Sequence, residues 1–268
     1  MALAVDVSNA DELEAAINAG AQYIRIIADI VIDRTFFISG QTTIFSTLPR
    51  TLTRAADFGG DFFVVGEDAQ GNSALLFGDN AKLVLGNPLS TKENLLIIDG
   101  NKDNMTVPVV GSALFISNSG IAELYTNVTV QNMYKTGNER TYGEKYNVSR
   151  PNRVGGAMAV VVLGTLNIYG GNYRSNLINQ EDTSSEETRN STNGGLIYNT
   201  SNVFIYGGLF ENNYAPRGGV IYNYRTLKIT GGSFVGNFAN SGGVIYAPNA
   251  TSSHQHIGST EEDGAQVL

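Results

Sequence analysis

The feature that most constrains the fold of this chain is a 24-residue repeat in its second half. The segment GGVIY at 218–222 returns at 242–246, and another glycine pair occupies 194–195, again 24 residues earlier. A fixed period between 20 and 50 residues is typical of stacked supersecondary units, each of which buries its apolar face against the next. The repeat therefore indicates a solenoid.

A second glycine pair recurs inside each unit, followed closely by an aromatic residue and, three positions later, an asparagine. Glycine reaches backbone angles that are closed to other residues, so these pairs indicate corners of the chain. We expect each aromatic ring to fill the core at a corner, and the asparagines to stack into an inward ladder. The glycine pairs begin at 170, 207 and 231, and the following residues are Tyr173 with Asn176, Phe210 with Asn213 and Phe234 with Asn237.

Short alternating segments precede these glycine pairs. In 227–229, for example, Leu227 and Ile229 would point inward and Lys228 outward, as in a half-buried strand. Short strands with glycine corners at this period predict an all-β fold, a parallel β-helix of about nine or ten coils stacked ~4.8 Å apart. Upstream of the clear repeats, the expected strands are 23–27, 30–33, 36–39, 62–65, 75–77, 83–85, 95–98, 113–116 and 128–130.

The chain divides into three parts on this interpretation. Residues 1–20 form an N-terminal cap, because 9–12 has the pattern of a helix capping box and an apolar stripe follows it. A short amphipathic helix there would cover the open end of the core. Residues 21–250 form the β-helix, and 251–268 form a polar tail that lacks the repeat. The last full repeat is then uncovered, so we expect the chain to be a segment of a longer protein.

Composition excludes several classes of function. The net charge of −8 and the lack of a basic cluster argue against a nucleic-acid partner. There are no cysteines to form disulfides or thiolate metal sites. No apolar run has the roughly 18 residues that a membrane helix needs, and the start of the chain lacks the pattern of a signal peptide. We expect a monomeric chain without a cofactor, a bound metal or a membrane-inserted segment.

The repeats resemble those of known surface proteins. The motifs GGLI, GGVI and GGVI, alternating with FENN and FVGN, are similar to the GGA[I/L/V] and FxxN repeats of chlamydial polymorphic outer-membrane proteins, although only GGAM at 155–158 keeps the alanine. They also resemble adhesin-like repeats in surface proteins of gut bacteria and methanogenic archaea. LLIIDGN at 95–101 resembles a segment of pectate-lyase-like β-helices. The resemblance implies a single-stranded, right-handed parallel β-helix in an extracellular, cell-surface adhesin.

A polysaccharide lyase or hydrolase is the main alternative function, and a structural spacer in a long surface protein is another. Hydrolysis of a glycosidic bond needs paired carboxylates at a defined separation. Asp99 and Asp103 are the best acidic candidates, but no adjacent Asp-Asp pair or nearby histidine accompanies them. The acidic runs at 181–187 and 261–263 have the composition of a solvated loop and tail. His254 and His256, the only histidines, lie in the tail and make a weak metal signal.

Binding has better support in the sequence, through two groups of aromatic residues. Tyr169, Phe204 and Tyr206 occupy outward strand positions, and Tyr198, Tyr222 and Tyr246 recur along one column, with Asn199 and Asn223 beside it. Aromatic rings next to polar groups suit a host-surface protein or a glycan. The alternative is that stacked rings only stabilise the sheet. The loops 134–153 and 178–192 would wall a groove with Tyr169, Phe204 and Tyr206 on its floor.

Overall fold

The structure is a computed structural model that describes residues 3–68, 81–135, 156–178 and 193–248, together with the backbone of four short strands outside these ranges. The expected strand at 75–77 lies outside the described residues. So do most of the loop 134–153, the loop 178–192 except its first residue, and most of the tail.

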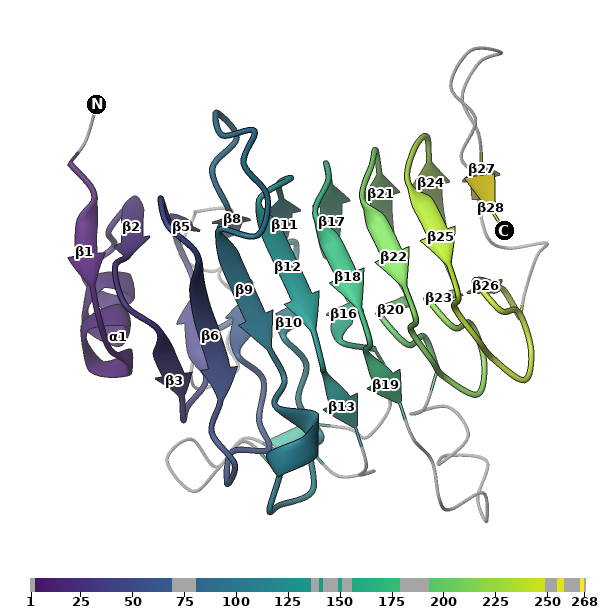
Figure 1. The fold of residues 1–268 in the computed structure, drawn as a ribbon, viewed down its shortest axis with the longest axis horizontal. Helices are drawn as coiled ribbons and strands as arrows, with labels where there is room; N and C mark the ends of the chain where they lie inside the picture. Colours follow the sequence, from purple (N-terminus) through teal and green to yellow (C-terminus); the bar gives the residue numbers. More distant parts are fainter. Residues whose placement is uncertain are drawn as a thin grey trace.

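Three parallel sheets run along the long axis of the molecule (Figure 1). The nine-stranded sheet has the order β1 (Val5–Val7), β2 (Tyr23–Ile26), β5 (Gln41–Phe45), β8 (Lys82–Leu85), β11 (Ile121–Leu124), β17 (Thr165–Ile168), β21 (Asn202–Ile205), β24 (Thr226–Ile229) and β27 (Gln255–Ile257). The eight-stranded sheet consists of β3 (Ile30–Ile32), β6 (Arg50–Arg54), β9 (Leu96–Asp99), β12 (Val128–Gln131), β18 (Asn172–Arg174), β22 (Leu209–Glu211), β25 (Ser233–Val235) and β28 (Gln266–Val267). The seven-stranded sheet consists of β4 (Phe36–Ile38), β7 (Phe63–Val65), β10 (Leu114–Ile116), β16 (Met158–Val160), β20 (Ile197–Asn199), β23 (Ile221–Asn223) and β26 (Ile245–Tyr246).

The chain visits these sheets in turn, so that each coil stacks on the one before it. In the clear repeats the register follows the 24-residue period: Ile197 pairs with Ile221, and Ile221 with Ile245. The prediction of an all-β parallel solenoid is confirmed. The number of complete coils is lower than the predicted nine or ten. In the described chain, seven successive coils each contribute one strand to all three sheets. Loops such as 86–95 and 100–113 lengthen some coils beyond 24 residues, which leaves residues for fewer of them.

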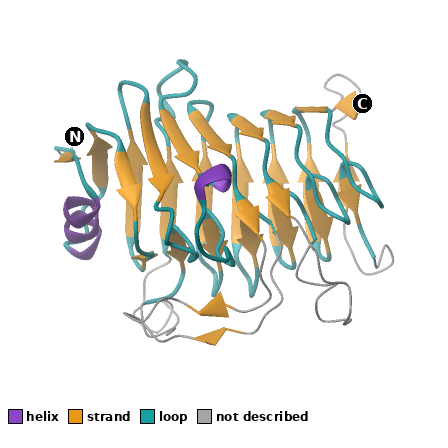
Figure 2. Ribbon diagram, turned by 60° about the horizontal axis from the view of Figure 1, so that its bottom comes forward, coloured by secondary structure: helices purple, strands orange, loops and turns teal. Residues whose placement is uncertain are grey.

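Smaller strands lie beside this framework. β13 (Tyr134–Lys135) pairs with β19 (Leu177–Ile178) in parallel, and β14 (Arg140–Thr141) pairs with β15 (Ser149–Arg150) in antiparallel fashion. A short 3-10 helix, Lys102–Asn104, follows β9. Figure 2 shows these connections on the outside of the stacked strands. β27 and β28 fall within 251–268, so part of that segment extends two of the sheets.

The repeated aromatic and asparagine residues fill the core as the sequence predicts. Tyr173, Phe210 and Phe234 are fully buried, and successive ring centroids are 5.0 and 4.5 Å apart. Asn176 donates from Nδ2 to Oδ1 of Asn213 at 2.9 Å, and Asn213 donates to Oδ1 of Asn237 at the same distance. The amide column thus satisfies polar groups inside the core, where an unpaired donor would be costly.

The glycine pairs have two separate roles at their corners. Gly218 has a φ of +66°, in the left-handed region that disfavours residues with a side chain. Gly219 has an ordinary φ, but a Cβ atom placed on it would lie 2.1 Å from the carbonyl oxygen of Gly243 in the next coil. The first glycine is therefore required by backbone conformation and the second by close packing of the coils.

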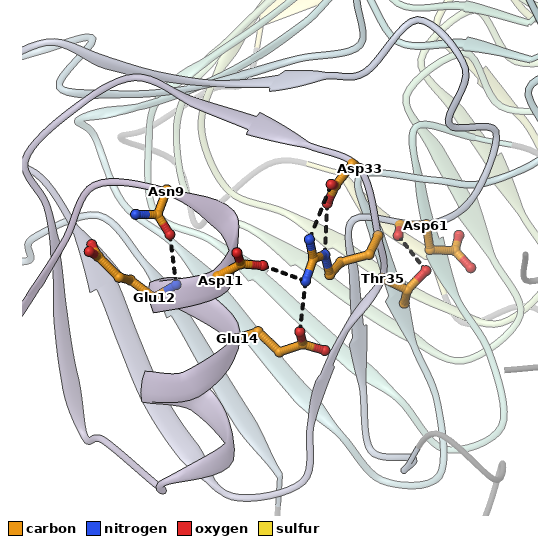
Figure 3. A network of polar contacts seen from close by, with 8 residues as sticks. Asn9, Asp11, Glu12, Glu14, Asp33, Thr35 and Asp61 are labelled. Atoms are coloured by element: carbon orange, nitrogen blue, oxygen red, sulfur yellow. Dashed lines mark hydrogen bonds and ion pairs between the residues drawn. The ribbon is translucent and has the colours of Figure 1, made fainter. Parts of the chain in front are cut away.

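One end of the solenoid is covered by helix α1 (Ala10–Asn18), as the capping-box pattern predicts (Figure 3). The Asn9 side chain accepts from the backbone N–H of Glu12 at 2.9 Å, while the Glu12 carboxylate accepts from Ser8. The Arg34 guanidinium, next to β3, then joins the helix to the first coil through Glu14 at 3.0 Å and Asp11 at 2.8 Å.

Candidate functional site

The outer face of the nine-stranded sheet carries a column of tyrosines. Tyr125, Tyr169 and Tyr206 each follow the last residue of a strand, β11, β17 and β21 respectively. Because Leu124 pairs with Ile168 and Ile168 with Ile205, the three tyrosines stand in neighbouring coils at one corner. We call these three residues the tyrosine column. Two of them belong to the predicted set; Tyr125 was missed because its coil lacks the glycine pair that marks this corner elsewhere.

The rings of the tyrosine column stack on one another. The centroids of Tyr125 and Tyr169 are 4.9 Å apart, and those of Tyr169 and Tyr206 are 5.1 Å apart with an interplanar angle of 9°. Tyr169 is 39% exposed and Tyr206 is 44% exposed, which is unusual for large rings and leaves their edges open to a partner. Thr230 takes the next place after Tyr206, so no ring of the described residues covers the outer side of Tyr206.

The hydroxyl groups of Tyr125 and Tyr169 are protonated at neutral pH. Partial burial, and then the negative charge of Glu123, raise the pKa of both Tyr125 and Tyr169. The Tyr125 hydroxyl donates to Oε2 of Glu123 at 3.4 Å, and Lys82 forms an ion pair with the same carboxylate at 2.9 Å. The column therefore presents ring edges and hydroxyl groups in line with the solenoid axis. Such groups can hydrogen-bond a polar chain that lies along the coils.

Phe204 lies on the same face but in a different column. It pairs in register with Asn167 on one side and Lys228 on the other, so it is flanked by polar residues. Phe204 is half-buried, and it points outward like Tyr206 because the two residues are two positions apart. The predicted strip of Tyr169, Phe204 and Tyr206 therefore consists of a stacked pair and a separate ring.

The second predicted ladder has a different environment from the one that the sequence indicates. Tyr198 and Tyr222 stack at 5.4 Å, and Tyr222 and Tyr246 at 5.6 Å, so the ladder itself exists. However, Tyr198 is 8% exposed and Tyr222 is 3% exposed. Their positions continue an outward row of buried apolar residues on the seven-stranded sheet, which includes Val64 and Phe115. The alternation of a strand predicts which side a ring faces, but not whether that side is covered.

The asparagines beside this ladder point into the core. Asn199 donates from Nδ2 to Oδ1 of Asn223 at 2.6 Å and to the carbonyl oxygen of Thr226 at 2.8 Å. Both asparagines are fully buried. They form a second internal amide pair. The prediction that they supply polar partners for a ligand at the tyrosines is therefore wrong.

The two acidic candidates for catalysis lie in different environments. Asp99 Oδ2 accepts from the side chains of Gln131 at 2.7 Å and Asn132 at 3.0 Å, and Oδ1 accepts from the backbone of Asn101. Asp103 is exposed in the short 3-10 helix. Among the described residues, no group of three or more acidic, histidine or cysteine side chains could hold a metal ion. His254 lies outside these residues, and of His256 only the backbone is described, in β27.

A buried polar cluster that the sequence analysis missed lies near β6. Arg54 is fully buried, its guanidinium is 4.5 Å from the Phe62 ring, and burial lowers its pKa to about 9 against the opposing charge of Asp61. Asp61 accepts from the backbone of Ser112 at 2.6 Å, and Lys135 Nζ donates to the Ser112 hydroxyl at 2.9 Å. These residues are 5% exposed or less, so they belong to the interior of the solenoid and not to its binding surface.

Comparison of the chain with models of protein families, with curated proteins and with solved structures finds no match. None of the helices in the described parts of the chain is long and apolar enough to cross a membrane.

Proposed function

We propose that this protein is a non-catalytic segment of an extracellular cell-surface adhesin, and that it binds a glycan or host-surface ligand through the outer face of the nine-stranded sheet. The observation that carries the proposal is the exposed tyrosine column. Contiguous exposed rings bordered by polar groups are typical of interaction surfaces. The repeat motifs that resemble those of bacterial and archaeal surface proteins give independent support.

The winding of the solenoid belongs to the same proposal. We infer a right-handed, single-stranded parallel β-helix, because crossover connections between parallel strands of one sheet are right-handed in nearly all proteins. A rod of this kind holds its outer sheet faces at fixed positions relative to one another, which suits repeated contacts with an extended ligand.

The geometry of the tyrosine column favours an extended, polar ligand. Stacked rings cover each other's faces, so Tyr169, between the other two, offers its edge and hydroxyl group, while Tyr206 also offers the side of its ring that faces Thr230. A glycan that runs along the axis could hydrogen-bond the hydroxyls and stack one sugar residue on Tyr206. Phe204 and Lys228, on neighbouring strands of the same face, would border this track.

A catalytic role has less support. A hydrolase needs a carboxylate that is available to transfer a proton or activate water. Asp99 already accepts three hydrogen bonds, and Asp103 lies in a separate, exposed turn. The spacer function shares the rod and its internal ladders with the adhesin, and the exposed rings are what distinguishes the adhesin from it.

The test compares two pairs of stacked aromatics in the intact chain. Tyr169→Ser with Tyr206→Ser removes two members of the tyrosine column. Tyr214→Ser with Phe238→Ser removes a matched pair at another corner, stacked at 5.8 Å with Phe238 61% exposed. Binding to a glycan array and to host cells should fall about tenfold or more for the first pair, equivalent to ~1.4 kcal/mol, and stay unchanged for the second.

Three outcomes would contradict the proposal. Equal binding by both variants would remove the tyrosine column from the ligand site. A lack of binding by the unaltered chain to any glycan or cell would favour the spacer. Release of reducing sugar from a bound polysaccharide would favour the enzyme.

A further inference from the structure

A hollow of about 220 Å³ lies on the outer face of the nine-stranded sheet, away from the tyrosine column and toward the N-terminal end. It spans β2, β5 and β8, which stand side by side (Figure 1). The residues that line it include Gln22, Tyr23, Gln41, Thr43 and Lys82. Its concave surface can hold a small ligand.

Several polar side chains at this hollow are free to bind a ligand. Among the described residues, the side chains of Gln22, Gln41 and Thr43 form no hydrogen bond within the protein. Gln22 and Gln41 are exposed, and Thr43 is half-buried beside them. Two amides and a hydroxyl supply both donors and acceptors within one small area. Polar groups that converge on a hollow fix the orientation of a bound molecule.

Tyr23 differs from the tyrosine column in the way that its ring is presented. It is 41% exposed, and no ring of the described part of the chain stacks on it. Its partner in register on β5 is Thr43, which is small. No aromatic ring of the described residues therefore covers a face of Tyr23, whereas the rings in the tyrosine column cover one another. An open tyrosine ring can pack against the apolar C–H face of a sugar ring.

The charge at the hollow selects against an anionic ligand. Among the described residues that line it, Lys82 is the only one with a charged side chain, and its ammonium group forms an ion pair with Glu123 at 2.9 Å. The remaining lining residues are neutral. An anion would have to compete with Glu123 for Lys82 and would gain little net attraction, so a neutral ligand fits this surface better.

From these observations we propose that the hollow is a binding site for one neutral sugar residue. Tyr23 forms the stacking platform, and Gln22, Gln41 and Thr43 supply the hydrogen bonds. The volume lies below the range of pockets that hold drug-sized ligands, which agrees with a single sugar ring. This site stands on other residues than the tyrosine column, so it can exist whether or not that column binds a glycan.

The experiment uses the intact chain with 13C-labelled tyrosine rings, titrated with the neutral methyl glycosides of glucose, galactose, mannose and N-acetylglucosamine. At least one should shift the Tyr23 ring resonances saturably, with a dissociation constant on the order of 1 mM, as expected for about a dozen ligand atoms at modest efficiency. Gln41→Ala should weaken that binding at least about fivefold, while Tyr206→Ala should leave it unchanged. The methyl glycoside of glucuronic acid, an anionic probe, should bind no more tightly than the glucoside.

The proposal is overturned if none of the four neutral glycosides shifts the Tyr23 ring saturably, or if Gln41→Ala leaves the affinity unaltered. Tighter binding of the glucuronide by tenfold or more would overturn the neutral selectivity. Because Tyr206→Ala is part of the experiment, failure at the hollow and failure of the tyrosine column give different patterns.

Discussion

The asparagine column inside the solenoid gives the sharpest stability prediction. In the unaltered chain, Oδ1 of Asn213 accepts from the backbone N–H of Asn176 at 3.2 Å and from its Nδ2 at 2.9 Å. The substitution Asn213→Ala removes this acceptor. Asn176 is fully buried, so its backbone N–H and one N–H of its side-chain amide lose their acceptor away from water, while the amide keeps its bond to the carbonyl oxygen of Val130 at 3.2 Å. Each buried unsatisfied donor costs ~1–3 kcal/mol, so the free energy of unfolding should fall by about 4 kcal/mol.

Asn237→Ala is the matched control at the outer end of the same column. Asn237 makes equivalent bonds to Asn213, but it is half-buried, so water can replace the lost acceptor. We expect a cost of ~1 kcal/mol for this variant. Guanidinium unfolding followed by far-ultraviolet circular dichroism measures both. Equal losses for the two variants, or a loss below ~1 kcal/mol for Asn213→Ala, would refute the argument that buried donors dominate.

Two further predictions concern the core and the corners. Burial raises the pKa of Tyr173 and Tyr222 above the ordinary value near 10, so their stabilising contribution is complete below about pH 10 and is lost as pH rises further. Unfolding at alkaline pH should coincide with the rise in tyrosinate absorbance, and the loss of stability with pH should be smaller in Tyr173→Phe. A free energy of unfolding that stays constant up to about pH 12 would contradict this. Gly219→Ala should cost more than ~3 kcal/mol in thermal or chemical unfolding because of the clash with Gly243, whereas Gly40→Ala, where a Cβ meets nothing within 4 Å, should cost less than ~1 kcal/mol.

The repeats made the corners and the core of the solenoid predictable. Gly218 and Gly219 indicated a corner, and Phe210 and Asn213 indicated a core column. Each coil needs the same backbone conformation and the same core contact at these places, so the same residue types recur in the sequence. Strands 41–45 and 50–54 were missed. Their threonines and arginines obscure the alternation, and Arg54 is an inward residue of a type that patterns assign to the surface.

The candidate site was only partly predictable, because exposure depends on what covers a face. Both Tyr169 and Tyr198 point outward, as the alternation along their strands predicts, yet the first is exposed and the second is buried. Tyr125 could have been found by extending the alternation of Ala122 and Leu124 by one residue. The hollow at Tyr23 could not, because it joins residues from three coils that lack a common motif.

The measurement that tests the central proposal most directly is a crystal structure of the intact chain with an oligosaccharide that it binds on an array. The proposal predicts an uncleaved glycan along the outer face of the nine-stranded sheet, with hydrogen bonds to the hydroxyl groups of Tyr125 and Tyr169 and a sugar residue packed on Tyr206. A glycan bound to another sheet, or a cleaved product next to Asp99 and Asp103, would contradict it.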